Sequence, residues 1–197
     1  MASTTRQRLT EAAVRRFYRD GFRNVGLDQV IAEVGISKTA FYKHFESKED
    51  LMLAALDMQH HWAQDAFRTV VAERGGDTVA GQVRSLFDLV GEISSSDEFQ
   101  GCFFVNAAME FPLQHEPAHV AAAQFKRSIE DFVHDLAARA GAADPRQMAR
   151  ELCMIMEGAY VTRQVSGDKQ SIEVARRLAE LVIAAHLPET AACSPND

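Results

Sequence analysis

Apolar residues recur at helical spacing along almost the whole chain. In the first such stretch, Leu9 and Phe17, with the alanines between them, fall on one face of a helix. Thr4 or Thr5 can cap the start of that helix, and Gly21 can end it. No stretch alternates between apolar and polar residues as a half-buried strand does. The sequence therefore predicts an all-α fold.

Short segments rich in Gly, Ser or Pro separate the other expected helices. We expect about nine helices in total. After the first, they lie at about residues 27–34, 37–45, 47–74, 79–93, 101–111, 117–140, 145–166 and 171–186.

Length and composition allow a substantial core. The chain has 197 residues, of which 47% are hydrophobic, so it can form one large domain or two small ones. We find neither a start that resembles a signal peptide nor an apolar run long enough to span a bilayer. The three cysteines, Cys102, Cys153 and Cys193, show no CxxC spacing, which argues against a disulfide framework and a zinc site. We expect a cytoplasmic protein.

The charge is unevenly distributed. The formal net charge of −7 would by itself argue against a nucleic-acid partner. Residues 1–50, however, hold nine basic and seven acidic side chains, a net of +2, whereas the remainder holds twelve basic and 21 acidic ones, a net of −9. The charge of the first fifty residues thus permits DNA binding.

The most informative segment is Leu27 to Leu51. It predicts two short amphipathic helices around Gly35, where the first helix must stop and the chain must turn. On the second of these helices Phe41 and Phe45 would face inward. The residues left on the outer side are Lys38, Thr39, Tyr42 and Lys43. A short helix of this kind fits the DNA major groove, which is about 12 Å wide, and its N-terminal residues would touch base edges.

The same segment resembles the signature of the tetracycline-repressor (TetR/AcrR) family. The similarity rests on Gly35-Ile36-Ser37, on Phe41-Tyr42-Lys43-His44-Phe45 and on Ser47-Lys48-Glu49-Asp50-Leu51, and it extends over roughly residues 6–53. The resemblance implies a helix-turn-helix DNA-binding domain over residues 1–48. It also implies a ligand-binding and dimerisation domain over residues 49–197.

The resemblance further implies roles for single residues. Ser37, Lys38 and Thr39 would read bases or nearby phosphates. The expected contacts to the DNA backbone come from Tyr42, Lys43, His44, Lys48 and Arg6. Two positions depart from the family pattern: Gly26 replaces a hydroxyl residue that usually caps the second helix, and Ala40 stands where a hydroxyl is frequent.

A stripe in the middle of the chain suggests a ligand pocket. Phe103, Asn106, Met109 and Glu110 combine one amide and one carboxylate with bulky apolar groups, as small-molecule sites do. The residues that could complete the pocket are Trp62, Phe87, Phe132, Met156, Glu157 and Tyr160. For each single residue, ordinary core packing is the competing interpretation.

Other kinds of site receive less support. His115 and His119 have a spacing that can hold a metal ion, but Pro117 between them makes a continuous helix doubtful. Cys102 adjoins two phenylalanines, which favours an inert buried thiol over a redox sensor. No motif of the common hydrolases, nucleotide-binding enzymes or metalloproteases is present, so we expect neither an enzyme nor a cofactor.

The function that follows is a ligand-responsive repressor. It would bind a palindromic operator in double-stranded DNA as a homodimer joined through residues 145–166 and 171–186, and a small, largely apolar effector would release it. One alternative is a helical small-molecule or protein-binding module whose head, the helix-turn-helix domain of residues 1–48, has lost DNA affinity. Another is a DNA regulator that takes no ligand.

Overall fold

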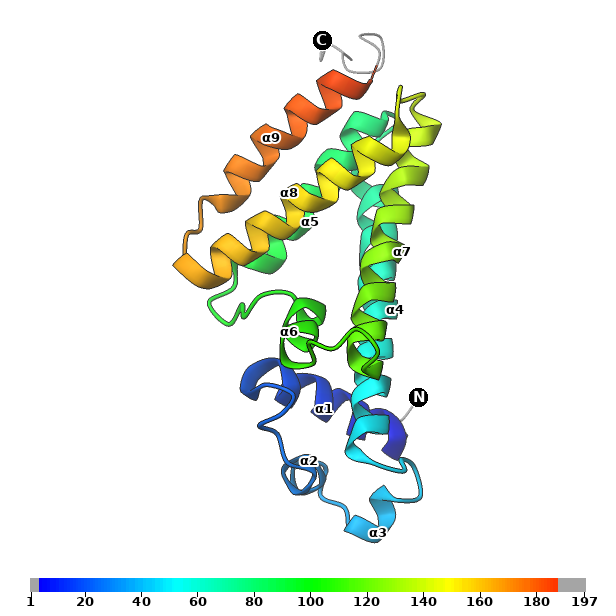
Figure 1. Cartoon of the computed structure of the whole chain (residues 1–197), viewed down its shortest axis with the longest axis vertical. Helices are drawn as coiled ribbons and strands as arrows, with labels where there is room; N and C mark the ends of the chain where they lie inside the picture. Colours follow the sequence, from blue (N-terminus) through cyan, green and yellow to red (C-terminus); the bar gives the residue numbers. More distant parts are fainter. Residues whose placement is uncertain (1–3, 188–197) are drawn as a thin grey trace. The chain divides into compact units, whose positions relative to one another are not determined.

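The computed structural model describes residues 4–187 and, over that range, contains nine α-helices and no strand (Figure 1). This confirms the all-α prediction. The helices are α1 (Thr5–Asp20), α2 (Leu27–Val34), α3 (Lys38–Phe41), α4 (Lys48–Arg74), α5 (Val79–Ser95), α6 (Phe103–Glu110), α7 (Pro117–Arg139), α8 (Pro145–Ser166) and α9 (Ser171–His186).

Polar side chains begin several of these helices, because the first amides of a helix have no partner within it. Thr4 Oγ1 accepts a hydrogen bond from Gln7 N (3.2 Å), as the sequence predicts. Asp144 Oδ1 does the same for Gln147 N (3.0 Å), next to a proline in the first turn of α8. Caps of this kind explain why helix starts can be read from sequence.

Helix α3 is shorter than expected. Regular α-helix ends at Phe41 rather than near Phe45. Beyond Phe41, two backbone hydrogen bonds join residues three apart rather than four: Lys43 N donates to Ala40 O (3.3 Å) and His44 N donates to Phe41 O (2.8 Å). The chain therefore winds on as a tighter turn, which is common at helix C-termini.

The described residues form two compact units. The first comprises residues 4–63 and 102–125, so it holds α1, α2, α3 and α6 with the first parts of α4 and α7. Its core includes a run of aromatic rings. Phe17 stacks on Phe22 with 5.2 Å between ring centroids, and Phe22 lies 4.9 Å from Phe103 of α6.

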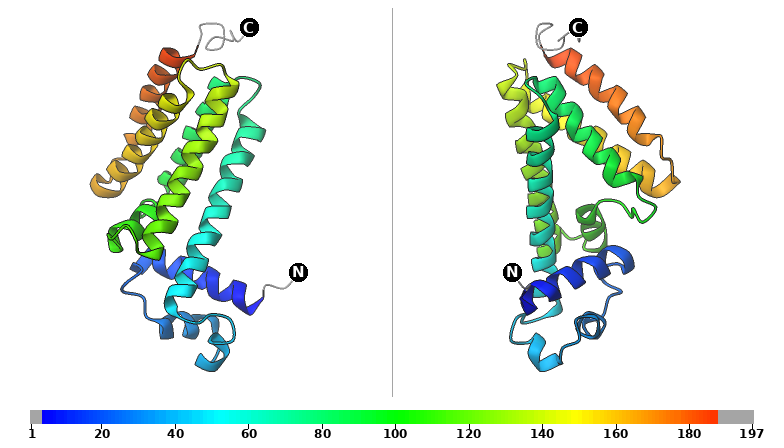
Figure 2. Two further views of the ribbon diagram at one scale, coloured as in Figure 1. Left: turned by 45° about the vertical axis from the view of Figure 1, so that its right-hand side comes forward. Right: turned by 180° about the vertical axis from the view of Figure 1, so that it is seen from behind.

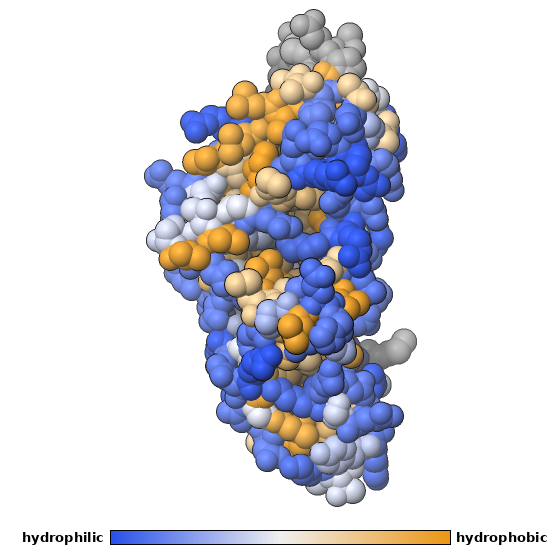
Figure 3. Space-filling model, viewed as in Figure 1, coloured by the Kyte–Doolittle hydropathy of each residue, from blue (hydrophilic) through white to orange (hydrophobic). Residues whose placement is uncertain are grey.

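The second unit comprises residues 64–101 and 126–187. Here α8 and α9 form an antiparallel hairpin, and α5 packs against both (Figures 1 and 2). Arg84 of α5 holds Glu180 of α9 through two hydrogen bonds of 2.6 and 2.8 Å. Figure 3 shows apolar side chains gathered on the surface over α8 and α9.

The structure bears on the cysteines and on the possibility of a membrane-spanning helix. Cys102 and Cys153 are free thiols and both are half-buried, whereas Cys193 lies outside the described residues. Burial, and then the nearby Glu130 and Glu157 carboxylates, raise the pKa of the Cys153 thiol to about 12. Between residues 4 and 187, no helix combines the length and the apolar character that a membrane span requires.

Candidate nucleic-acid interface

The turn between α2 and α3 is built around Gly35. Its backbone is left-handed (φ 74°, ψ 39°), and its amide donates to the carbonyl oxygens of Ile31 and Ala32. The next amide, that of Ile36, also donates to Ile31 O (3.3 Å). This arrangement satisfies the last carbonyls of α2 and reverses the chain within two residues, which a side chain at Gly35 would oppose.

Helix α3 then separates an anchoring side from an exposed side. Ser37 Oγ caps it by accepting from Ala40 N (3.1 Å). Phe41 and Phe45 are buried, and their rings lie 5.7 Å apart. Lys38, Thr39, Tyr42 and Lys43 are exposed as the sequence predicts, and 53% of Tyr42 is accessible. The exposed residues thus form a polar outer surface on a helix that two aromatic rings hold in place.

Two arginines of α1 donate hydrogen bonds to backbone carbonyl oxygens of the helix-turn-helix. Arg8 Nη2 donates to Val34 O (2.8 Å) at the end of α2. Arg6 Nη1 donates to His44 O just after α3, and its guanidinium lies 4.1 Å from the centre of the Phe45 ring. The Arg8 cation at the C-terminal end of α2 also interacts favourably with the dipole of that helix. The sequence predicted only a DNA contact for Arg6 and no role for Arg8, because nothing in a sequence pairs a side chain with a carbonyl 26 or 38 residues away.

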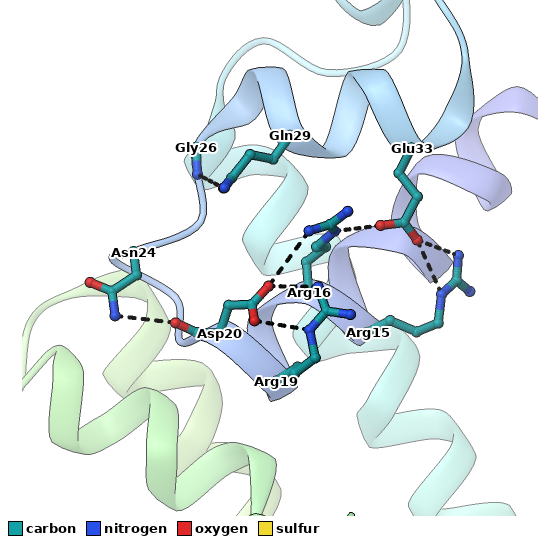
Figure 4. A network of polar contacts seen from close by, with 8 residues as sticks. All are labelled: Arg15, Arg16, Arg19, Asp20, Asn24, Gly26, Gln29 and Glu33. Atoms are coloured by element: carbon teal, nitrogen blue, oxygen red, sulfur yellow. Dashed lines mark hydrogen bonds and ion pairs between the residues drawn. The ribbon is translucent and has the colours of Figure 1, made fainter.

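Ion pairs join α1 to α2 as well (Figure 4). Glu33 of α2 lies between Arg15 and Arg16 of α1 and accepts hydrogen bonds from both. Burial raises the pKa of the Glu33 carboxyl, but the hydrogen bonds from Arg16 and Arg15 outweigh it, so the pKa lies below its ordinary value. Within α1, Arg19 and Arg16 also contact Asp20 (2.8 and 3.7 Å).

The two departures from the family pattern have visible consequences. Gly26 provides no side-chain cap for α2, and Gln29 Oε1 instead accepts from Gly26 N (2.7 Å). Ala40 is half-buried on α3.

Near the start of α2, Asp28 pairs with Lys38 Nζ (3.2 Å) on the exposed surface, so one expected base-reading residue has an acidic neighbour.

Comparison with known proteins matches both parts of the chain. The family profile described as bacterial regulatory proteins of the tetR family matches residues 9–55. A second profile, for tetracyclin repressor-like C-terminal domains, matches residues 80–179. The chain belongs to the TetR family. It is therefore a DNA-binding transcriptional regulator, in a family of regulators rather than of enzymes.

Solved TetR-family structures share the fold. SCO4454 from Streptomyces coelicolor is 30% identical with a TM-score of 0.85, and the match covers 91% of this chain and 94% of that one. A putative TetR-type regulator from Streptomyces avermitilis is 29% identical with a TM-score of 0.81, covering 94% and 100%. Among curated proteins, the transcriptional regulator YjdC of Escherichia coli is 23% identical over 163 residues, which are 83% of this chain and 85% of YjdC.

Within this TetR-family protein, the residues expected to line an effector pocket fall into both compact units. The first unit contains Trp62, Phe103, Asn106, Met109 and Glu110, and the second contains Phe87, Phe132, Met156, Glu157 and Tyr160.

In the first unit, these residues have quite different surroundings. Phe103 is buried against the Phe22 ring, but Met109 is 76% exposed and Trp62 is also exposed. Glu110 is bound to backbone amides of the α1–α2 turn.

In the second unit, the aromatic candidates lie in the core or beside it. Phe87 is buried, and the Tyr160 ring stacks on that of Phe99 at 5.3 Å. Glu157 instead faces outward and pairs with Lys126 (3.0 Å).

One of the two histidines that suggested a metal site contacts the backbone instead. His119 Nδ1 lies 2.9 Å from Phe111 O. Within residues 4–187, the His, Cys, Asp and Glu side chains do not gather into a group of three or more that could hold a metal ion.

Proposed function

We propose that the protein is a ligand-responsive repressor that binds a palindromic operator as a homodimer and is released by a small, largely apolar effector. Residues 1–48 would form the DNA-binding domain, and residues 49–197 would bind the effector and the second subunit. The exposed polar side of α3, fixed by Phe41 and Phe45, is the observation that carries this proposal. Such a regulator would act on DNA in the cytoplasm.

DNA recognition would begin at the start of α3. Ser37, Lys38 and Thr39 occupy its first turn, the position from which a recognition helix touches base edges. The proposed contacts to phosphates come from Tyr42, Lys43, His44, Lys48 and Arg6. An ammonium has three donors, so Lys48 Nζ can hold the two carbonyls that it contacts and still reach a phosphate.

Dimerisation would use α8 and α9. Both helices expose apolar residues at helical spacing, seven and four on α8 and four and three on α9, which places the residues of each helix on one side. These residues are Met154, Val161 and Val165 on α8, and Val174, Leu178 and Leu181 on α9. Val165 is 81% and Leu181 64% accessible. A monomeric protein rarely exposes a large apolar surface to water, so such a surface marks an interaction site.

The same surface suits a second copy of the hairpin. At Gly158, between the exposed α8 residues, an added Cβ would meet nothing within 4 Å, so another helix can approach there. Two hairpins related by a twofold axis would form a four-helix bundle. A twofold dimer presents two copies of α3, which would read half-sites about 34–36 Å apart in successive major grooves.

An apolar effector is supported by the residues available to it. The candidates are dominated by aromatic rings and methionines, and methionine-rich linings adapt to varied apolar ligands. Release follows if the effector binds more tightly to a conformation that does not fit the operator. The change in DNA affinity then equals at most the difference in effector binding between the two conformations.

Selection of random duplex DNA by the purified full-length protein, near physiological salt and read by sequencing, tests this function. We expect enrichment of a palindrome whose half-site centres lie one helical turn apart or a multiple of it. Enrichment of single half-sites would contradict the dimer, and enrichment of no sequence would contradict a repressor that needs no corepressor. A thermal-shift screen of apolar compounds then tests the effector, because a ligand of the folded state raises apparent stability.

A further inference from the structure

The α1–α2 turn, residues 21–26, is held by a residue far away in the sequence. Glu110, the last residue of α6, accepts two backbone hydrogen bonds with its carboxylate. Phe22 N donates to Oε1 (2.8 Å), and Arg23 N donates to Oε2 (2.7 Å). Both carboxylate oxygens are thus used on consecutive amides, the strong kind of hydrogen bond that a charged acceptor makes.

The side chain of Arg23 in turn contacts the end of α6. Its Nε donates to the backbone carbonyl oxygen of Glu110 (2.7 Å) at the C-terminal end of α6. Its guanidinium also lies 4.8 Å from the centre of the Phe111 ring and 3.8 Å from a carboxylate oxygen of Glu116. The end of α6 and the α1–α2 turn are therefore joined in both directions.

Lys48 holds the other side of the same dipeptide. From the first residue of α4, its Nζ donates to Phe22 O (2.6 Å) and Arg23 O (3.3 Å). Burial lowers the pKa of Lys48, and the nearby Glu110 carboxylate partly offsets this. The amides of Phe22 and Arg23 thus go to an anion on α6 and their carbonyls to a cation on α4.

Gly21, the first residue of the turn, lies close to the same carboxylate. Gly21 has φ +87°, and a Cβ added there would lie 3.1 Å from Glu110 Oε1. The turn leads directly into α2, whose start at Gly26 has no side-chain cap. Where α2 begins, and hence where α3 lies, depends on how this turn is held.

We propose that Glu110 is a positioning residue for DNA binding: from α6 it fixes the α1–α2 turn against Lys48 and so sets the geometry of the helix-turn-helix. The proposal concerns the protein without effector. It gives α6 a direct influence on the DNA-binding head through one carboxylate.

If Glu110 acted only through its charge, its removal would strengthen DNA binding, whereas a positioning role predicts weaker binding. Removing an acidic side chain close to a DNA-binding domain reduces repulsion of phosphates and should strengthen binding to any duplex. Glu110→Gln should instead weaken specific binding, because the amide side chain leaves an acceptor for only one of Phe22 N and Arg23 N and the turn is loosened. The sign of the change therefore separates a positioning residue from an ordinary surface charge.

The test uses Glu110→Gln in the full-length protein, titrated with the selected palindrome and with a scrambled duplex of equal length. We expect the Kd for the palindrome to rise about tenfold, which corresponds to a loss of about 1.4 kcal/mol of binding free energy. The Kd for the scrambled duplex should stay the same or fall slightly. An unchanged or lower Kd for the palindrome would overturn the proposal.

A matched control is Glu49→Gln, which removes the same charge from the exposed residue beside Lys48. It should leave binding of both duplexes unchanged or slightly tighter. The double variant Glu110→Gln/Lys48→Met should lose less affinity than the product of the single losses, because both side chains hold one dipeptide. Fully independent losses would contradict a shared role.

Amide hydrogen exchange of the wild-type protein gives a test that needs neither a variant nor an operator. The amides of Phe22 and Arg23 should exchange at least tenfold more slowly than that of Asn24 in the same turn. Equal rates would refute the anchoring by Glu110 even if selection returns no palindrome. Slow exchange without a palindrome would instead refute the proposed operator and leave the anchoring in place.

Discussion

Lys38 and Thr39 are exposed in the first turn of α3, one and two residues after the Ser37 cap. We expect Lys38→Ala and Thr39→Ala each to change the preferred base at one position of each half-site, at a cost of about 1–3 kcal/mol for the original sequence. Lys43→Ala, farther along the exposed side, should weaken all sequences similarly. Repeating the selection of random duplexes with each variant measures this. An unchanged preferred site in both variants would exclude base reading by these residues.

Lys48 combines a structural contact with a proposed phosphate contact. Replacing it with Met retains most of its length and removes the charge. We expect weaker binding to every duplex and a plot of log K against log salt whose slope falls by about one, the value of one lost phosphate contact. Titrations at several salt concentrations measure the slope. A slope identical to that of the wild type would mean that Lys48 acts only on the Phe22 and Arg23 carbonyls.

At the level of elements, α2 offers two glycines with opposite requirements. Gly35 ends the helix at φ +74°, whereas Gly26 begins it at φ −80°. Gly35→Ala should lower the free energy of unfolding by about 1–2 kcal/mol, since the left-handed backbone disfavours a Cβ although space is open around it. Gly26→Ser should leave stability unchanged or raise it by a few tenths of a kcal/mol, because serine can cap α2. Urea unfolding compares the two, and equal effects would contradict this assignment of the turn.

The elements themselves could largely be predicted from the sequence, because caps and breaks are local. Thr4, Ser37 and the proline at position 145 mark helix starts through groups within three residues of them. The end of α3 could not be predicted so well, since no residue at Phe41 or Tyr42 breaks the helical pattern where the three-residue hydrogen bonds begin. Helical periodicity fixes a side of a helix, but not what faces that side.

Site residues show the same limit more sharply. Phe103, Met109 and Glu110 read as one stripe, yet Phe103 is buried, Met109 is largely exposed and Glu110 binds a turn 88 residues away. The partners of Glu110, like that of Arg8, are backbone groups that every residue possesses. No pattern of side chains marks such a contact, so only the tertiary structure reveals it.

At the scale of the whole molecule, operator binding by two heads depends on the exposed apolar surface of α8 and α9. Leu181→Glu would place a charge in the centre of the proposed bundle, where desolvation is costly. We expect this variant to be monomeric at concentrations where the wild type is dimeric, as measured by sedimentation or light scattering. Leu113→Glu is the matched control, since Leu113 is comparably exposed (56%) but lies in the other compact unit, and it should remain dimeric.

The same pair of variants connects assembly to function. When two heads are joined, binding of the second half-site is intramolecular, so the dimer gains about 10²–10⁴-fold in affinity over a single head. Leu181→Glu should therefore lose the preference for a palindrome over a single half-site while retaining the same preferred half-site sequence. A Leu181→Glu protein that stays dimeric would place the dimer interface elsewhere than on α8 and α9. A monomeric Leu181→Glu protein that still prefers the palindrome would contradict the dependence of operator binding on this dimer.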